Sequence, residues 1–115
     1  MKIGFDFDDV LTNEKILDFA KLLNLHSELF IITSRFEEKW NIDLQSVKKA
    51  LSLPSKKVTA IFLGGTGKTK AEMINELEID LFFEDCPVEC EQINENSNAL
   101  CLLVPVDVET FMNKF

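Results

Sequence analysis

Two groups of acidic residues follow apolar runs of the sequence and are the first candidates for chemistry. Asp6, Asp8 and Asp9 lie at the end of the first apolar run, and Glu84 and Asp85 close a later one. Neighbouring carboxylates repel one another unless a proton or a cation neutralises one of them. Mg²⁺ prefers carboxylate oxygens and is often held by one or two carboxylates together with a phosphate. The acidic groups therefore predict a magnesium site that receives a phosphorylated molecule.

Hydroxyl and ammonium groups follow two further apolar runs. Thr33 and Ser34 end the second run, where hydroxyl and backbone N–H groups can hold phosphate oxygens. Lys68 and Lys70 come just before a segment of helical period, and a lysine there can neutralise a phosphoryl group. The ordinary alternatives are helix capping for the acidic and hydroxyl residues and a solvated position for the lysines. Their occurrence together favours a functional site.

Apolar runs that alternate with helix-period segments must position these residues. Five strands are predicted at residues 2–7, 28–33, 58–63, 80–84 and 99–104. Helices are predicted over 14–25, over 36–51, after Lys70, from Pro87, and around Val108, Phe111 and Met112. The core face of helix 36–51 is expected to carry Phe36, Trp40, Leu44, Val47 and Leu51. This pattern indicates one α/β domain over residues 1–115, a three-layer sandwich with a five-stranded parallel, Rossmann-like sheet. Strand alternation would put Asp6 and Asp8 on the same side of its carboxyl edge, where ligands bind.

Composition narrows the class of function. The net charge of −8 argues against general nucleic-acid binding. No apolar run reaches the ~20 residues that span a bilayer, and acidic residues interrupt the N-terminal run, so neither a membrane segment nor a signal peptide is predicted. Three cysteines and one histidine do not suggest a zinc site, and reduced thiols in the cytoplasm are expected. The loop GGTGKT lacks the first glycine of a P-loop.

The same residues carry a family resemblance. Asp6-Phe7-Asp8-Asp9-Val10 looks like the DxDx[TV] motif of haloacid dehalogenase-like (HAD) proteins. Thr33, Lys70 and the pair Glu84-Asp85 resemble the second, third and fourth motifs of that superfamily. The resemblance is greatest to its 5'-nucleotidase/deoxyribonucleotidase-like branch, and it covers residues 1–105. It implies a HAD-like sheet with the strand order 5-4-1-2-3.

The resemblance implies a magnesium-dependent phosphatase that hydrolyses a phosphomonoester through an aspartyl-phosphate. Asp6 would be the nucleophile, and Asp8 would act as general acid and then as general base. Mg²⁺ would bind Asp6, the backbone carbonyl of Asp8 and Asp85, with Glu84 beside it.

The resemblance also implies how the phosphoryl group would be held. Thr33 and Lys70 would bind its oxygens, with Lys68 as the alternative lysine. Asp9 and Ser34 would complete the substrate site. The expected substrate is a small phosphorylated molecule such as a nucleotide.

The chain departs from the family in having no room for a cap domain. About twenty residues separate Asp9 from the second strand, and one helix uses them. The second insertion point holds only the helix predicted over 36–51. An open site leaves room for a cover from another subunit, and thus for a homo-oligomer. The departure keeps open the alternative of a catalytically degenerate HAD-like module that binds a metal or a phosphate.

Overall fold

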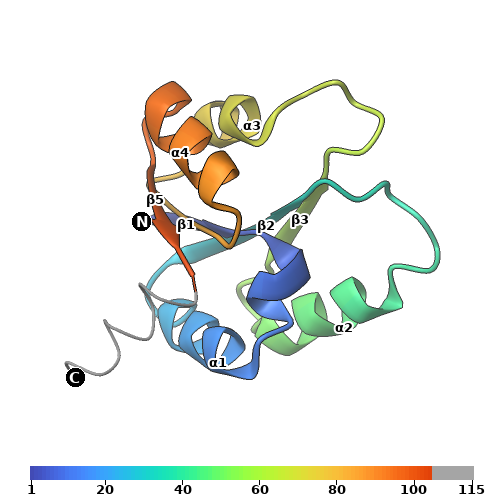
Figure 1. Cartoon of the computed structure of the whole chain (residues 1–115). Coiled ribbons are helices and arrows are strands. Elements are labelled where there is room, and N and C mark those ends of the chain that lie inside the picture. The colour runs from blue at the N-terminus through green and yellow to red at the C-terminus, as the bar shows by residue number, and fades with distance from the viewer. Residues whose placement is uncertain (105–115) are drawn as a thin grey trace.

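The computed structural model describes residues 1–104, which form a parallel sheet between two layers of helices (Figure 1). The strands are β1 (Lys2–Phe5), β2 (Glu28–Thr33), β3 (Thr59–Phe62), β4 (Leu81–Glu84) and β5 (Leu100–Leu103). The α-helices are α1 (Glu14–Leu23), α2 (Ile42–Leu51), α3 (Lys70–Leu77) and α4 (Pro87–Asn96). All strand pairs are parallel, and the order is β3-β2-β1-β4-β5. The predicted parallel sheet and its strand order are confirmed, whereas the helix expected around Val108, Phe111 and Met112 lies outside the described residues.

Both faces of the sheet are buried, which is why the strands read as continuous apolar runs. Successive side chains of a strand point to opposite faces. Phe83 of β4 packs on the face that α1 and α2 cover, where its ring stacks on Phe5 at 4.9 Å between centroids. Phe82 packs on the other face with Ile74 of α3 and Ile93 of α4. No helix within residues 1–104 is long and apolar enough to cross a membrane.

The chain turns sharply as soon as β1 ends. Its next element, η1 (Phe7–Leu11), leaves helical geometry at Asp8 (ψ 130°) and at Asp9, whose φ of 61° is left-handed. The Asp9 N–H donates to Thr12 Oγ1 at 3.1 Å. Neither aspartate caps α1, because Asn13 fills that position and its Oδ1 accepts the Lys15 N–H at 3.0 Å.

The helix predicted over 36–51 begins only at Ile42. Residues 34–41 form a loop instead, in which Asn41 Nδ2 donates to the Phe36 carbonyl at 2.7 Å. Leu44 is buried as predicted, but Phe36 and Trp40 are 61% and 72% exposed. The placement of these two aromatic residues in the core was therefore wrong. A side chain that bonds the loop's own backbone competes with helix formation there.

The glycine-rich loop between β3 and α3 begins beside the start of this β2–α2 loop. The Gly64 N–H donates to the Arg35 carbonyl at 3.0 Å. A Cβ on Gly64 would lie 2.7 Å from the backbone nitrogen of Phe36, so only glycine permits this approach. The two loops therefore form one connected rim beside the carboxyl ends of β2 and β3.

Candidate functional site

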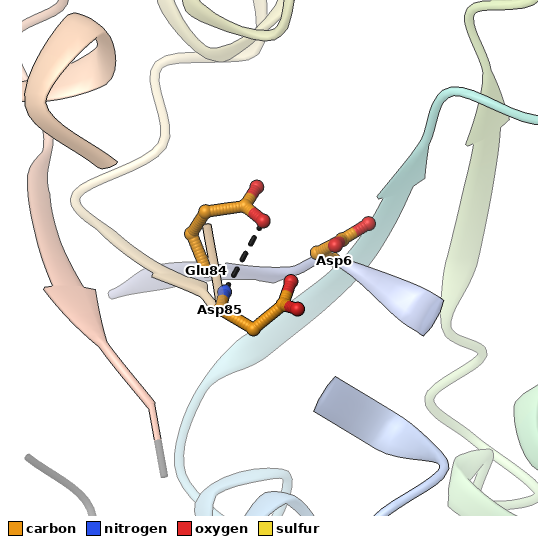
Figure 2. A group of neighbouring side chains, drawn as sticks. All are labelled: Asp6, Glu84 and Asp85. Atoms are coloured by element: carbon orange, nitrogen blue, oxygen red, sulfur yellow. Dashed lines mark hydrogen bonds between the residues drawn. The ribbon is translucent and has the colours of Figure 1, made fainter. Parts of the chain in front are cut away.

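The carboxyl ends of β1 and β4 bring three acidic residues together. Asp6, Glu84 and Asp85 each offer an oxygen within 4.8 Å of the others (Figure 2). The Asp6 N–H donates to the Phe83 carbonyl at 3.0 Å, which fixes Asp6 against β4. From β1 the chain continues to β2 and β3 on one side and returns to β4 and β5 on the other. Ligands of such open sheets bind at the point where the strand order switches.

The ammonium of Lys70 lies within this acidic group. Its Nζ is 2.7 Å from Glu84 Oε2, 2.9 Å from Glu89 Oε2 and 3.2 Å from Asp6 Oδ1. The side chain is only 7% exposed, and it starts α3 directly after the capping residue Thr69. The alternative of a solvated lysine therefore fails for Lys70.

Lys68 shows the contrasting arrangement. Its Nζ donates to both carboxylate oxygens of Glu76 at 2.9 Å, and both side chains are exposed. Of the two lysines that the sequence left open, the structure places Lys70 beside Asp6 and Lys68 in a surface ion pair.

Burial governs the electrostatics of the group. It raises the pKa of the Asp6 carboxyl and raises the pKa of Glu84 to about 8. Burial would lower the pKa of Lys70, but the charges of Asp6, Glu84 and Glu89 outweigh it and raise that pKa. Three carboxylates contact the ammonium and Asp85 adds a fourth, so negative charge is in excess among these residues. The group thus favours a proton or a further cation.

The donor atoms of the acidic group fit a hard divalent cation. Asp6, Glu84 and Asp85 offer only carboxylate oxygens, which suit Mg²⁺ better than softer metals. A cation held by these three residues would neutralise the excess charge and attract a phosphate.

Ser34 and Lys70 line one cavity of about 500 Å³, together with Thr69 and Glu89. Thr33 is buried at the end of β2, where its Oγ1 accepts the Arg35 N–H at 3.2 Å. This bond holds the start of the β2–α2 loop. Hydroxyl and ammonium groups in one cavity can receive the oxygens of an anion.

Asp8 and Asp9 lie apart from this group, contrary to expectation. The Asp8 carboxylate is not part of the acidic group, and both of its oxygens accept hydrogen bonds from Arg35 at 2.7 and 3.0 Å. Asp9 is exposed on the left-handed turn. The alternation that would have placed Asp8 beside Asp6 does not apply, since β1 ends at Phe5.

Sequence reasoning missed three residues around the site, which are Glu89, Arg35 and Asp43. Glu89 and Asp43 stand in the first turns of α4 and α2, where acidic residues are common without any function. Arg35 offered a signal, because it is the single arginine of the sequence and directly follows Thr33-Ser34. Its partner Asp8 is 27 residues away in sequence, and no local pattern indicates that contact.

Comparison with known proteins identifies the fold. No protein-family model matches the sequence, and no curated protein matches it. The chain is similar to a solved structure, the crystal structure of a universal stress protein in complex with cAMP. The match covers 91% of this chain and 96% of that one, with 14% identity and a TM-score of 0.57. At that identity the likeness shows the Rossmann-like fold alone.

This comparison corrects the predicted family. The assignments to the HAD superfamily, to its phosphatases and to a degenerate HAD-like module were wrong, because the matching structure is a universal stress protein. The resemblance depended on short acidic motifs at the edge of a parallel sheet, and one fold can carry many functions there. Asp8 illustrates the difference, since Arg35 holds the carboxylate that was expected to protonate a leaving group. The single domain over residues 1–115, the magnesium ion, the homo-oligomer, the absence of nucleic-acid binding and the cytoplasmic location stay predictions.

Proposed function

We propose that this protein binds a small nucleotide together with a divalent cation at the carboxyl edge of its sheet. The observation that supports this function is the buried ammonium of Lys70 beside Asp6 and Glu84 at the β1–β4 switch point. Such a combination of buried charges is costly, and it is typical of functional sites.

The cation explains how an acidic site accepts a phosphate. Carboxylates alone repel phosphate oxygens, whereas Mg²⁺ on Asp6, Glu84 and Asp85 joins the two. Ser34 lines the adjoining cavity and supplies a hydroxyl for a remaining oxygen, while Lys70 lines the same cavity with an ammonium that already contacts three carboxylates. In this role Asp6 is a ligand of the cation. The universal stress protein of similar fold is complexed with cAMP, which supports a small nucleotide as the ligand class.

Isothermal titration calorimetry with AMP, ATP and cAMP tests the proposal. We expect at least one of the three to bind in millimolar Mg²⁺ and to bind at least about tenfold more weakly in EDTA, because the cation carries the phosphate contact. Asp85→Asn should weaken binding by a similar factor. The matched control is Asp18→Asn, which alters an exposed carboxylate on α1 and should leave the affinity unchanged. A folded wild type that binds none of the three nucleotides in Mg²⁺ would contradict the proposed function.

A further inference from the structure

Three exposed apolar side chains gather on the β2–α2 loop and at the start of α2. Phe36, Trp40 and Ile42 are 61%, 72% and 73% exposed, and with Arg35 they line a groove of about 910 Å³. Other exposed apolar side chains of residues 1–104 lie on separate elements, for example Leu22 on α1. Contiguous apolar exposure marks binding surfaces, whereas scattered exposure is normal.

We propose that this aromatic groove receives the base of the nucleotide, stacked on the rings of Trp40 and Phe36. The inference rests on the proposed function. It gives a binding place to the base, the part of the nucleotide that the phosphate site does not contact. Aromatic side chains bind bases by stacking, with little dependence on which base is present.

The glycine-rich loop fixes one wall of the groove. A Cβ on Gly65 would lie 3.0 Å from the ring of Phe36, and Gly65 itself has a φ of +77°. Because Gly64 approaches the backbone of Phe36 as closely, this exposed ring is supported from behind. A surface that is already in place loses less conformational entropy when a ligand binds.

Arg35 fixes the other wall and is a positioning residue. Its five N–H groups donate to Asp8, Asp43 and Asn41, so all of them already have partners within the protein. Its guanidinium also lies over the buried ring of Phe7, 4.9 Å from the centroid. These contacts pin the β2–α2 loop to the turn after β1, two residues beyond Asp6.

The groove and the Lys70 cavity are lined by consecutive residues of the β2–α2 loop. Ser34 lines the cavity that contains Lys70, and Arg35 lines the aromatic groove. Consecutive residues have Cα atoms about 3.8 Å apart, so the two spaces come near each other at this point, and the inference requires a ligand that crosses the loop there. The phosphate would lie on the Lys70 side of the loop and the base on the Trp40 side.

The dimensions of the groove favour a small molecule over a protein. Its volume lies within the range of small-molecule sites, which is roughly 300–1,000 Å³. A stable protein interface uses about 20–30 residues on each side, whereas eight residues line this groove.

Intrinsic fluorescence tests the inference directly, because Trp40 is the only tryptophan of the chain. AMP and ribose 5-phosphate, which lacks the base, are titrated in Mg²⁺ and followed by fluorescence and calorimetry. AMP should change the Trp40 emission and bind about tenfold or more tightly than ribose 5-phosphate. Trp40→Ala should lower the affinity for AMP by about tenfold and leave the affinity for ribose 5-phosphate unchanged. Trp40→Phe should retain most of the affinity for AMP. Leu22→Ala, which removes another exposed apolar side chain, on α1, should change neither affinity.

The outcomes separate the inference from the proposed function. Equal affinities for AMP and ribose 5-phosphate, with unchanged Trp40 emission, overturn the inference and leave the phosphate site standing. Absence of binding by either ligand overturns the inference, and it overturns the proposed function as well if ATP and cAMP also fail to bind. Sedimentation of the wild type as a dimer that Trp40→Ala dissociates would show that the groove binds a second copy, which also overturns the inference.

Discussion

Lys70 and Arg35 both lie near the carboxyl end of β1, and each contacts carboxylates. The two groups differ in how far they are exposed to water. Lys70 is 7% exposed and contacts Asp6, Glu84 and Glu89, whereas Arg35 is 27% exposed and pairs with Asp8 and Asp43, which are more than half exposed. Water screens the charges of the Arg35 group, so they interact weakly with an approaching ligand. The first group is poorly solvated, and its charges depend on one another. The comparison supports the proposal that the charged part of a ligand binds at the Lys70 group, whereas the contacts of Arg35 shape the loop.

Removing the buried cation should have the largest effect. We expect Lys70→Met to lower the free energy of unfolding by about 3 kcal/mol or more, because it leaves buried carboxylates without their partner. Urea unfolding at neutral pH measures this loss. Lys68→Met is the control and should change stability by about 0.5 kcal/mol or less, since its ion pair is exposed. If both variants lost the same free energy of unfolding, the buried lysine would contribute no more to stability than the exposed one, and the comparison would fail.

The pH dependence of stability should come next in size. Burial raises the pKa of Glu84 to about 8 from an ordinary value of 4.5, among the charges of Asp6, Lys70, Asp85 and Glu89. The folded protein therefore binds a proton that the unfolded chain releases. This stabilisation is complete below pH 4.5 and is lost as the pH rises through 8.

In EDTA, the free energy of unfolding should thus decrease by about 1.4 kcal/mol per pH unit at most in that window. Glu84→Gln, which cannot titrate, should flatten the slope, while Glu76→Gln on the surface of α3 should preserve it. A wild-type stability that rises with pH across this window would show that Glu84 is ionised throughout.

The exposed cation should give the smallest effect on stability. Arg35→Lys keeps the charge but cannot make five hydrogen bonds in a plane. We expect a loss of about 1 kcal/mol, reduced at high salt because the carboxylate partners are exposed. Hydrogen exchange at the Gly64 amide, which bonds the Arg35 carbonyl, should accelerate as the two loops separate. A variant with unchanged exchange and unchanged Trp40 emission would mean that Arg35 does not position the loop.

The strands were predictable because burial on both faces leaves a strong apolar signal. Ile3 and Phe5, or Leu29 and Ile31, identify strands without knowledge of their partners. The switch point followed once the strand order was right, and with it the meeting of Asp6 and Glu84. Apolar patterning and the shared direction of parallel strands predicted the strands and their common edge, whereas the strand order came from the family resemblance.

The remaining features depend on contacts between distant residues. Phe36 and Trp40 fit the period of the helix that follows them, but the bonds of Asn41 to Phe36 and Arg35 organise a loop there. Asp8 matched a catalytic motif in sequence, but the turn at Asp8 and Asp9 directs its carboxylate to Arg35. A short motif records residue types, whereas a function depends on where the side chains point.

Because β1 is the central strand, its two edges become paired at different stages of synthesis. Ile3 pairs with Leu29 early, but its other neighbour in the sheet is Leu81. Pairings so distant in sequence form slowly, and until then one edge of β1 is open to other chains. The proposed nucleotide site needs the pairing of β1 with β4, because Asp6 bonds the Phe83 carbonyl and Glu84 follows on the same strand. A nascent chain that ends before residue 81 therefore lacks the proposed site, and a nucleotide bound there would stabilise only molecules in which β1 is paired on both sides.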